Sequence, residues 1–160
     1  MSSVNYNPFS LAEKTILISG AAGGIGKATA IECAKLGAQL ILTDINEEGL
    51  KATLSCLENG NLHHYVVANL TIDEEIDKLV GEIDKLEGLV SNAGVTKPAP
   101  VKFINRTDLE RIMSINAMAP MYLTQRLLKK KKFAKNSSIV FTVSIGGVYT
   151  TAYGNAMYGS

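Results

Sequence analysis

The chain has 160 residues, of which 46% are hydrophobic, and its 16 basic and 15 acidic side chains leave a formal net charge of +1. This length suits one packed domain, and near neutrality gives no electrostatic basis for binding nucleic acid or an anionic membrane. No apolar run approaches the roughly 18 residues of a membrane-spanning helix, and residues 1–10 lack a secretion-signal pattern. A protein of the cytoplasm is therefore expected.

The first predicted strand, residues 15–19, follows an irregular polar lead-in at 1–14. It ends in a glycine-rich stretch, after which apolar residues recur at three- and four-residue steps and predict a helix over 25–36. Gly37 stands where a helix commonly stops.

The glycines between this strand and helix are spaced as in a dinucleotide-binding turn. Because glycine lacks a Cβ atom, Gly20 permits a tight turn, Gly24 permits the backbone to approach a pyrophosphate, and Gly26 permits close helix packing. The helix then points its N-terminal amides at the phosphates. An ordinary strand-to-helix turn without a ligand is the alternative.

The second predicted strand, residues 39–43, is followed directly by Asp44, roughly 20 residues past the glycines. A carboxylate at this place can accept hydrogen bonds from both hydroxyl groups of an adenosine ribose. It would repel a 2′-phosphate, and neither Ala22 nor Gly23 offers a basic partner for one. The sequence therefore predicts NAD rather than NADP as the cofactor.

The rest of the chain continues to alternate helix and strand. The predicted elements are a helix capped by Asn46 and running to the turn at 58–60, a strand at 64–67, a helix from 71–74 to about Leu86, a strand at 88–91, a loop at 95–105, a helix at 107–131 and a strand at 138–143. Pro120 is expected to kink the long helix. Five strands in this rhythm predict a single α/β domain, a Rossmann-type doubly wound parallel sheet of order 3-2-1-4-5.

Three other patterns are interpreted as structural. The lysines at 129–132 are expected at the solvated end of a helix, with a phosphate-binding patch as the alternative. Cys33 and Cys56 lack metal-ligand spacing and are expected to be buried thiols in a reducing compartment. His63 and His64 are adjacent, so a strand would place them on opposite faces, and no metal site is predicted.

The glycine-rich turn after the first strand and the end of the strand at 88–91 together resemble the short-chain dehydrogenase/reductase family, in the branch that includes β-ketoacyl-acyl carrier protein reductase. Residues 19–26 are similar to the family's T-G-x-x-x-G-I-G turn, and residues 91–94 to its N-N-A-G strand end. The resemblance covers nearly the whole chain but only the first two-thirds of a typical member, without the last two strands. It implies hydride transfer between a nicotinamide cofactor and a small-molecule alcohol or carbonyl substrate, with 3-oxoacyl compounds and sugar or steroid alcohols as the types that the family includes.

The resemblance implies a cofactor site that draws on four strand ends. The residues expected to bind the cofactor are Gly20, Gly23, Gly24, Ile25, Gly26, Asp44, Asn69, Leu70, Asn92, Ala93 and Gly94. Asn69 stands where the family usually has an aspartate against the adenine. The asparagine keeps an oxygen acceptor for the adenine amine but loses the charge.

The resemblance also implies a catalytic set of Asn116, Ser144 and Tyr158. Tyr158 would exchange a proton with the substrate oxygen, Ser144 would hydrogen-bond that oxygen, and Asn116 would hold a water in a proton relay. Tyr158 opens a Y-x-x-x-K signature whose lysine would be residue 162, past the end of the sequence. Tyr149 and Tyr153 are rivals, but neither has a lysine four residues later.

Two alternatives to an active oxidoreductase stay open. One is a catalytically inactive nucleotide-binding domain, and the other is a remnant that only associates with itself, since an open sheet edge exposes apolar surface. The resemblance implies a dimer or tetramer formed through the helix that carries Asn116. The sequence predicts no particular substrate, because the segment that covers it in the family lies beyond residue 160.

Overall fold

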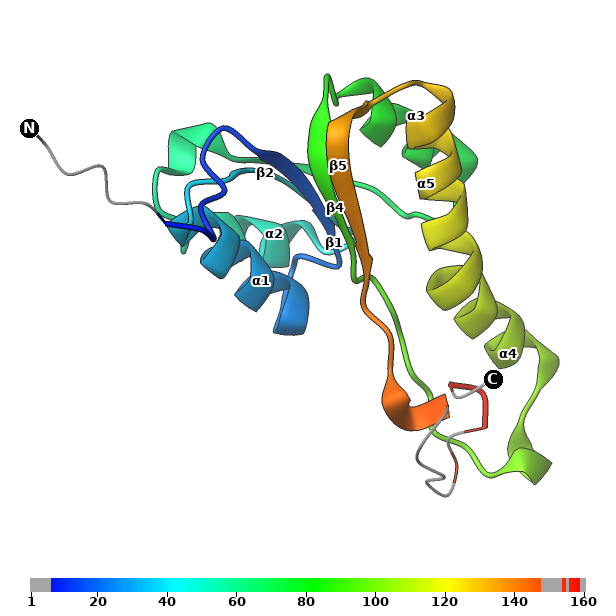
Figure 1. Cartoon of the computed structure of the whole chain (residues 1–160). Coiled ribbons are helices and arrows are strands. Elements are labelled where there is room, and N and C mark those ends of the chain that lie inside the picture. The colour runs from blue at the N-terminus through cyan, green and yellow to red at the C-terminus, as the bar shows by residue number, and fades with distance from the viewer. Residues whose placement is uncertain (1–6, 148–153, 155, 159–160) are drawn as a thin grey trace, which may run out of the picture.

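The structure, a computed structural model, describes residues 7–147, 154 and 156–158, which form a five-stranded parallel sheet between two layers of helices (Figure 1). The strands are β1 (Thr15–Ser19), β2 (Gln39–Asp44), β3 (His64–Val67), β4 (Leu86–Ser91) and β5 (Phe133–Phe141). The helices are α1 (Gly24–Lys35), α2 (Glu47–Leu54), α3 (Asp73–Gly81), α4 (Arg106–Met113) and α5 (Ala119–Lys129). The sheet order β3-β2-β1-β4-β5 confirms the predicted fold class.

The central strands β1 and β2 are largely apolar because both faces of the sheet are covered there. Successive side chains of β1 point to opposite faces of the sheet and pack in different hydrophobic cores. Ile16 and Ile18 pack with α1 and α2, whereas Leu17 packs with α3 and α5. Leu42 and Ile41 of β2 divide in the same way. The sheet thereby presents the carboxyl ends of its strands at one edge, where ligands of such folds bind.

Two element boundaries differ from the prediction. Helix α3 ends at Gly81, and Leu86 belongs to β4, where its amide donates to the carbonyl oxygen of Lys132 (2.8 Å). Ile83 and Leu86 are fully buried and three residues apart, so their spacing imitates a continuing helix. Strand β5 starts at Phe133, five residues early: Phe133 pairs with Leu86, and a register shift between Leu86 and Gly88 then places Ser138 opposite Gly88.

The long helix predicted at 107–131 is α4 followed by α5, joined by a π-helical turn over Ser114–Met118. Pro120 has no amide hydrogen to donate to the preceding turn, and its ring crowds that turn. The widened turn directly before Pro120 accommodates this loss. The expected irregularity therefore lies one turn before the proline and includes Asn116.

The lysines at 129–132 end α5, and the first three are exposed, as predicted. Lys132 is half-buried and donates to the carbonyl oxygen of Ile83. The expectation of two buried thiols is wrong for Cys56, which is exposed just after α2. Cys33 is half-buried, and burial, assisted by the nearby Glu32 carboxylate, raises the pKa of its thiol.

His63 is buried and His64 exposed, as expected for neighbours on opposite faces. The Nδ1 atom of His63 accepts from the amide of Leu40 (3.1 Å), and its Nε2 lies 2.8 Å from the carbonyl oxygen of Glu58. These partners assign the neutral Nε2-protonated ring, which joins β2 to the link before β3. Within the described ranges, no group of three His, Cys, Asp or Glu side chains could hold a metal, and no helix could span a bilayer.

Candidate functional site

The glycine-rich turn between β1 and α1 is built around close backbone contacts. Gly20 has φ +68°, and a Cβ atom on it would lie 2.8 Å from the Cα of Ala93. A Cβ atom on Gly26 would lie only 2.1 Å from the carbonyl oxygen of Gly20. Both positions therefore require glycine, as the turn and packing roles predicted.

The middle of the same turn is open. Cβ atoms on Gly23 or Gly24 would meet no atom within 4 Å, although Gly24 has φ +52°. Helix α1 starts here without a side-chain cap and without an acidic residue in its first turn, and Ile25 is 65% exposed. By contrast, Asn46 caps α2. Free amides beside open space at the positive end of a helix suit a diphosphate.

Asp44 lies at the end of β2, beside this turn. Its Oδ2 accepts from the amide of Ala22 (3.2 Å) and its Oδ1 from the amide of Asn46 (3.0 Å). A carboxylate has about four acceptor sites, so each oxygen keeps capacity for a further donor. The structure thus places the carboxylate that is predicted to bind the ribose next to the turn that is predicted to bind the diphosphate.

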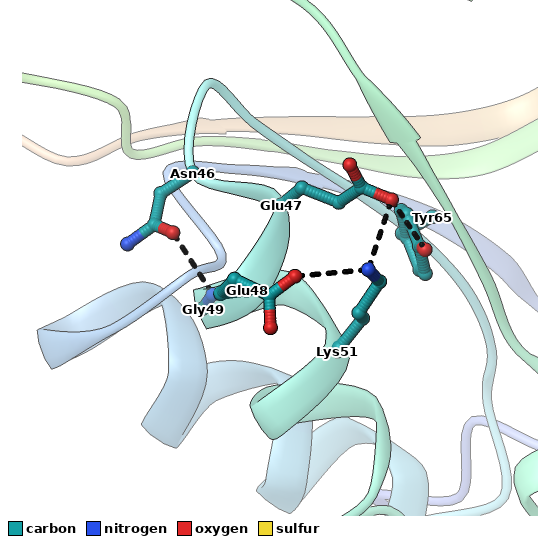
Figure 2. Close-up of polar contacts among 6 residues, drawn as sticks. All are labelled: Asn46, Glu47, Glu48, Gly49, Lys51 and Tyr65. Carbon is teal, nitrogen blue, oxygen red and sulfur yellow. Dashed lines mark hydrogen bonds and ion pairs between the residues drawn. The ribbon is translucent and has the colours of Figure 1, made fainter.

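A cluster of charges follows Asp44 on the first turns of α2 (Figure 2). The ammonium of Lys51 lies 2.9 Å from Glu48 and 3.3 Å from Glu47, and the Tyr65 hydroxyl donates to Glu47 (3.1 Å). The hydrogen bond from Lys51, then that from Tyr65, lowers the pKa of Glu47, and Glu48 first, then Glu47, raises the pKa of Lys51. Both carboxylates are more than half exposed, so the cluster adds little stability.

The end of β4 is tied to the turn through Ser19. The Oγ of Ser19 accepts from the amides of Asn92 (3.0 Å) and Ala93 (3.2 Å), and the Asn92 side chain donates to the carbonyl oxygen of Gly20 (3.3 Å). Ser19 itself is fully buried. It was not among the predicted site residues, because its role depends on contacts with residues 73 and 74 positions later in the sequence.

Asn116 is fixed by the segment that follows β4. Its Oδ1 accepts from the amide of Val95 and its Nδ2 donates to the carbonyl oxygen of Val95, both at 2.9 Å. A Cβ atom on Gly94 would lie 3.4 Å from the same Oδ1. The π-helical turn therefore holds Asn116 against the strand end that the sequence assigned to the cofactor, and Asn116 uses one of its two amide hydrogens in this contact.

Ser144 and Tyr158 lie on the chain after β5. Ser144 is exposed and its Oγ accepts from the amide of Gly146 (3.0 Å), and Tyr158 is 37% exposed. No hydrogen bond among the described residues joins either of them to Asn116. The rivals Tyr149 and Tyr153 lie outside the described residues.

The segment after β5 returns to the loop after β4. The carbonyl oxygen of Gly154 accepts from the amide of Ala99 (2.7 Å), and Met157 is buried. Both segments leave the carboxyl ends of neighbouring strands and lie together beyond that end of the sheet (Figure 1). The strand ends thus share one edge with the glycine-rich turn.

A family model described as "short chain dehydrogenase" matches residues 14–160. The chain belongs to the short-chain dehydrogenase family.

Curated relatives show how far this likeness extends. The 3-oxoacyl-[acyl-carrier-protein] reductase FabG of Rickettsia bellii is 38% identical over 138 residues, which make up 86% of this chain and 56% of the relative. Estradiol 17-beta-dehydrogenase 11 of Mus musculus is 33% identical over 143 residues, 86% of this chain and 48% of the relative. The chain thus spans about half the length of the curated relatives it matches.

Solved structures of the family agree in fold. A short-chain dehydrogenase/reductase from Brucella melitensis superposes with a TM-score of 0.88 at 32% identity, covering 94% of this chain and 65% of that one. A short-chain dehydrogenase from Escherichia coli CFT073, solved in complex with NADPH, has a TM-score of 0.85 at 28% identity. The match covers 96% of this chain and 68% of that one.

Asn69, which is expected to lie against the adenine, has local hydrogen-bond partners in the structure. The Oδ1 of Asn69, expected to accept from an adenine amine, already accepts from the amide (3.1 Å) and hydroxyl (2.8 Å) of Thr71. These two bonds occupy both lone pairs of the oxygen. Leu70 is 8% exposed and packs in the core with α3 and α5, so its side chain serves packing.

The loop after β4 is held to α4 by a charged contact that sequence reasoning missed. The ammonium of Lys97 lies 2.6 Å from Asp108, which also accepts from the side chain of Asn105 (2.6 Å). The carboxylate is 18% exposed. The hydrogen bond from Lys97, then that from Asn105, lowers the pKa of Asp108.

We expect this contact to make the loop at 95–105 sensitive to acid. Because the folded carboxyl has the lower pKa, its stabilisation is complete above the ordinary aspartate pKa and is lost as the pH falls through the folded value. Hydrogen-exchange protection of the loop should fall severalfold in Asp108→Asn at pH 7. The variant should also lose the acid dependence below pH 4.

The matched control is Glu110→Gln on the same helix, where the ion pair with Arg106 is exposed and long at 3.5 Å. It should leave loop protection unchanged. Equal protection in Asp108→Asn and the unmodified chain would show that the contact does not hold the loop.

Proposed function

We propose that this chain forms the nicotinamide dinucleotide-binding part of an oxidoreductase that exchanges a hydride with an alcohol or carbonyl substrate. The observation that carries the proposal is the open turn at Gly23 and Gly24, with uncapped amides of α1 on one side and the carboxylate of Asp44 on the other. Diphosphate and ribose are the neighbouring groups of a dinucleotide that match these two features.

We propose NAD as the preferred dinucleotide. A 2′-phosphate on the ribose would bring negative charge to Asp44 and to the acidic first turn of α2, which contains Glu47 and Glu48. The neighbouring cation, Lys51, is engaged by both of these carboxylates. The charges near the proposed ribose position therefore oppose a phosphate there.

Calorimetric titration with NAD and NADP tests this proposal. The unmodified chain should bind NAD, and Asp44→Ala should bind it about tenfold more weakly, since a charge-assisted hydrogen bond contributes roughly 1.5–3 kcal/mol. The same change should bring the affinities for NAD and NADP closer together. Asp84→Ala, an exposed aspartate in the link between α3 and β4, is the control and should bind like the unmodified chain. Unchanged affinities for both dinucleotides in Asp44→Ala would reject the ribose role.

We propose the chemical step for the whole protein rather than for residues 1–160 alone. The bound cofactor would supply the hydride, and the protein would supply placement and proton transfer. The hydroxyl of Tyr158 would exchange the proton of the substrate oxygen, which the hydroxyl of Ser144 would orient, while Asn116 would hold a relay water. A phenol is a weak base at neutral pH and needs a neighbouring cation, which the family places four residues after the tyrosine.

We propose self-association as a second property of the chain. Large apolar side chains are exposed along the π-helical turn and its neighbours α4 and α5, namely Met113 (38%), Met118 (41%), Met121 (63%), Tyr122 (46%) and Leu128 (58%). Such a stripe loses contact with water when two copies pack together. Met121→Glu should shift the molar mass measured by light scattering toward the monomer.

The control for this test is Val101→Glu, which places the same charge on an apolar residue of similar exposure (73%) in the loop after β4. It should keep the mass of the unmodified chain. A monomeric unmodified chain at high protein concentration contradicts self-association.

A further inference from the structure

Helix α2 contacts the glycine-rich turn through a buried hydroxyl. The side chain of Thr53 is fully buried, and its Oγ1 donates to the carbonyl oxygen of Ala21 at 2.8 Å. On its other side, the amide of Ala21 donates to the carbonyl oxygen of Thr43 (3.2 Å). The peptide groups of Ala21 are thus held by α2 and by β2.

The next residue of the turn is in close contact with the same helix. A Cβ atom on Gly49 would lie 2.7 Å from the Cβ of Ala22 and 2.8 Å from its carbonyl oxygen. Asn46 caps the helix at this point by accepting from the amide of Gly49 (3.0 Å), as Figure 2 shows. The amide of Ala22 itself donates to Asp44. Helix α2 therefore touches the turn directly before its open part.

We infer that Thr53 is a positioning residue for the dinucleotide, and that Gly49 permits the approach through which it acts. This inference rests on the proposed function. Ala21 and Ala22 lead directly into the open amides after Gly23, so holding their peptides in place orients the amides that would face the diphosphate. Because Ala22 also binds Asp44, the same contact relates the phosphate position to the ribose carboxylate.

The test compares dinucleotide binding in Thr53→Val, Thr53→Ser and the unmodified chain. The temperature is one at which circular dichroism shows that each of them is folded. Valine keeps the shape of threonine but cannot donate to Ala21. We expect NAD to bind Thr53→Val three- to tenfold more weakly and Thr53→Ser within twofold of the unmodified chain. The control is Thr124→Val, which removes a similar bond to the carbonyl oxygen of Pro120 (2.7 Å) in α5 and should leave affinity unchanged.

A second variant keeps the test decisive if Thr53→Val does not fold. Gly49→Ala should push α2 away from Ala22 and weaken NAD binding at least threefold. Its control is Gly81→Ala at the end of α3, where a Cβ atom would meet nothing within 4 Å.

The outcomes separate this inference from the proposal beneath it. An unmodified chain that binds neither NAD nor NADP overturns the proposed function, and the inference with it. An unmodified chain that binds NAD, together with Thr53→Val or Gly49→Ala of equal affinity, overturns the role of α2 alone. Equal losses in Thr53→Val and Thr124→Val would assign the effect to general stability and also overturn the inference.

Discussion

Gly26→Ala should lower the free energy of unfolding by more than about 3 kcal/mol, or prevent folding. The added Cβ would lie 2.1 Å from the carbonyl oxygen of Gly20 and 2.8 Å from the side-chain nitrogen of Asn92. The first contact is with backbone of the turn directly after β1, so α1 must move away from this turn. Overpacking of a core typically costs 1–3 kcal/mol, and a clash with fixed backbone costs more. Urea denaturation followed by circular dichroism measures the loss.

Gly81→Ala is the matched control for this prediction. It also places alanine in a helix, but the new Cβ meets no atom within 4 Å. It should stabilise the chain by up to about 1 kcal/mol, because alanine has the higher helix propensity. A Gly26→Ala variant as stable as the unmodified chain would contradict the packing between α1 and the turn.

Ser19→Ala should lower the free energy of unfolding by about 2–4 kcal/mol. The fully buried hydroxyl of Ser19 accepts from the amides of Asn92 (3.0 Å) and Ala93 (3.2 Å), and alanine would leave both without this partner. A buried donor without an acceptor costs roughly 1–3 kcal/mol. We expect the loss in urea denaturation, together with weaker NAD binding, since the end of β4 would no longer be tied to the turn.

Ser19→Thr keeps the hydroxyl and is the control for Ser19→Ala. Threonine also stands at this place in the family's turn, so the variant should keep most of the stability and the affinity for NAD. If Ser19→Thr were as unstable as Ser19→Ala, the volume of the site rather than its hydroxyl would explain the loss.

Local sequence patterns predicted most of the fold because strands β1 to β4 are short, largely apolar and separated by strong turn signals. Gly37 ends the first helix region and Asn46 caps α2, both as predicted. The errors arose where burial and periodicity disagree. Leu86 follows helical spacing but pairs with Phe133 in the sheet, and the polar start of β5 shows no strand pattern because it lies at the edge of the described sheet.

The candidate site was predictable where its residues are close in sequence or share a strand edge. The glycine-rich turn and Asp44 belong to adjacent parallel strands, so their proximity follows from the topology. Thr53 and Ser19 could not be assigned in this way. Thr53 acts through a bond to a residue 32 positions earlier, and Ser19 through bonds to residues 73 and 74 positions later. Such contacts depend on how helices pack on the sheet.

The most direct test of the dinucleotide site is an amide chemical-shift titration of the isotope-labelled chain with NAD. We expect the largest shifts at Gly23, Gly24 and Ile25, with further shifts at Asp44 and at the end of β4, because these amides surround the proposed diphosphate and ribose positions. Shifts confined to the opposite edge of the sheet, around the lysines at 129–132, or no shifts at millimolar NAD, would contradict the account.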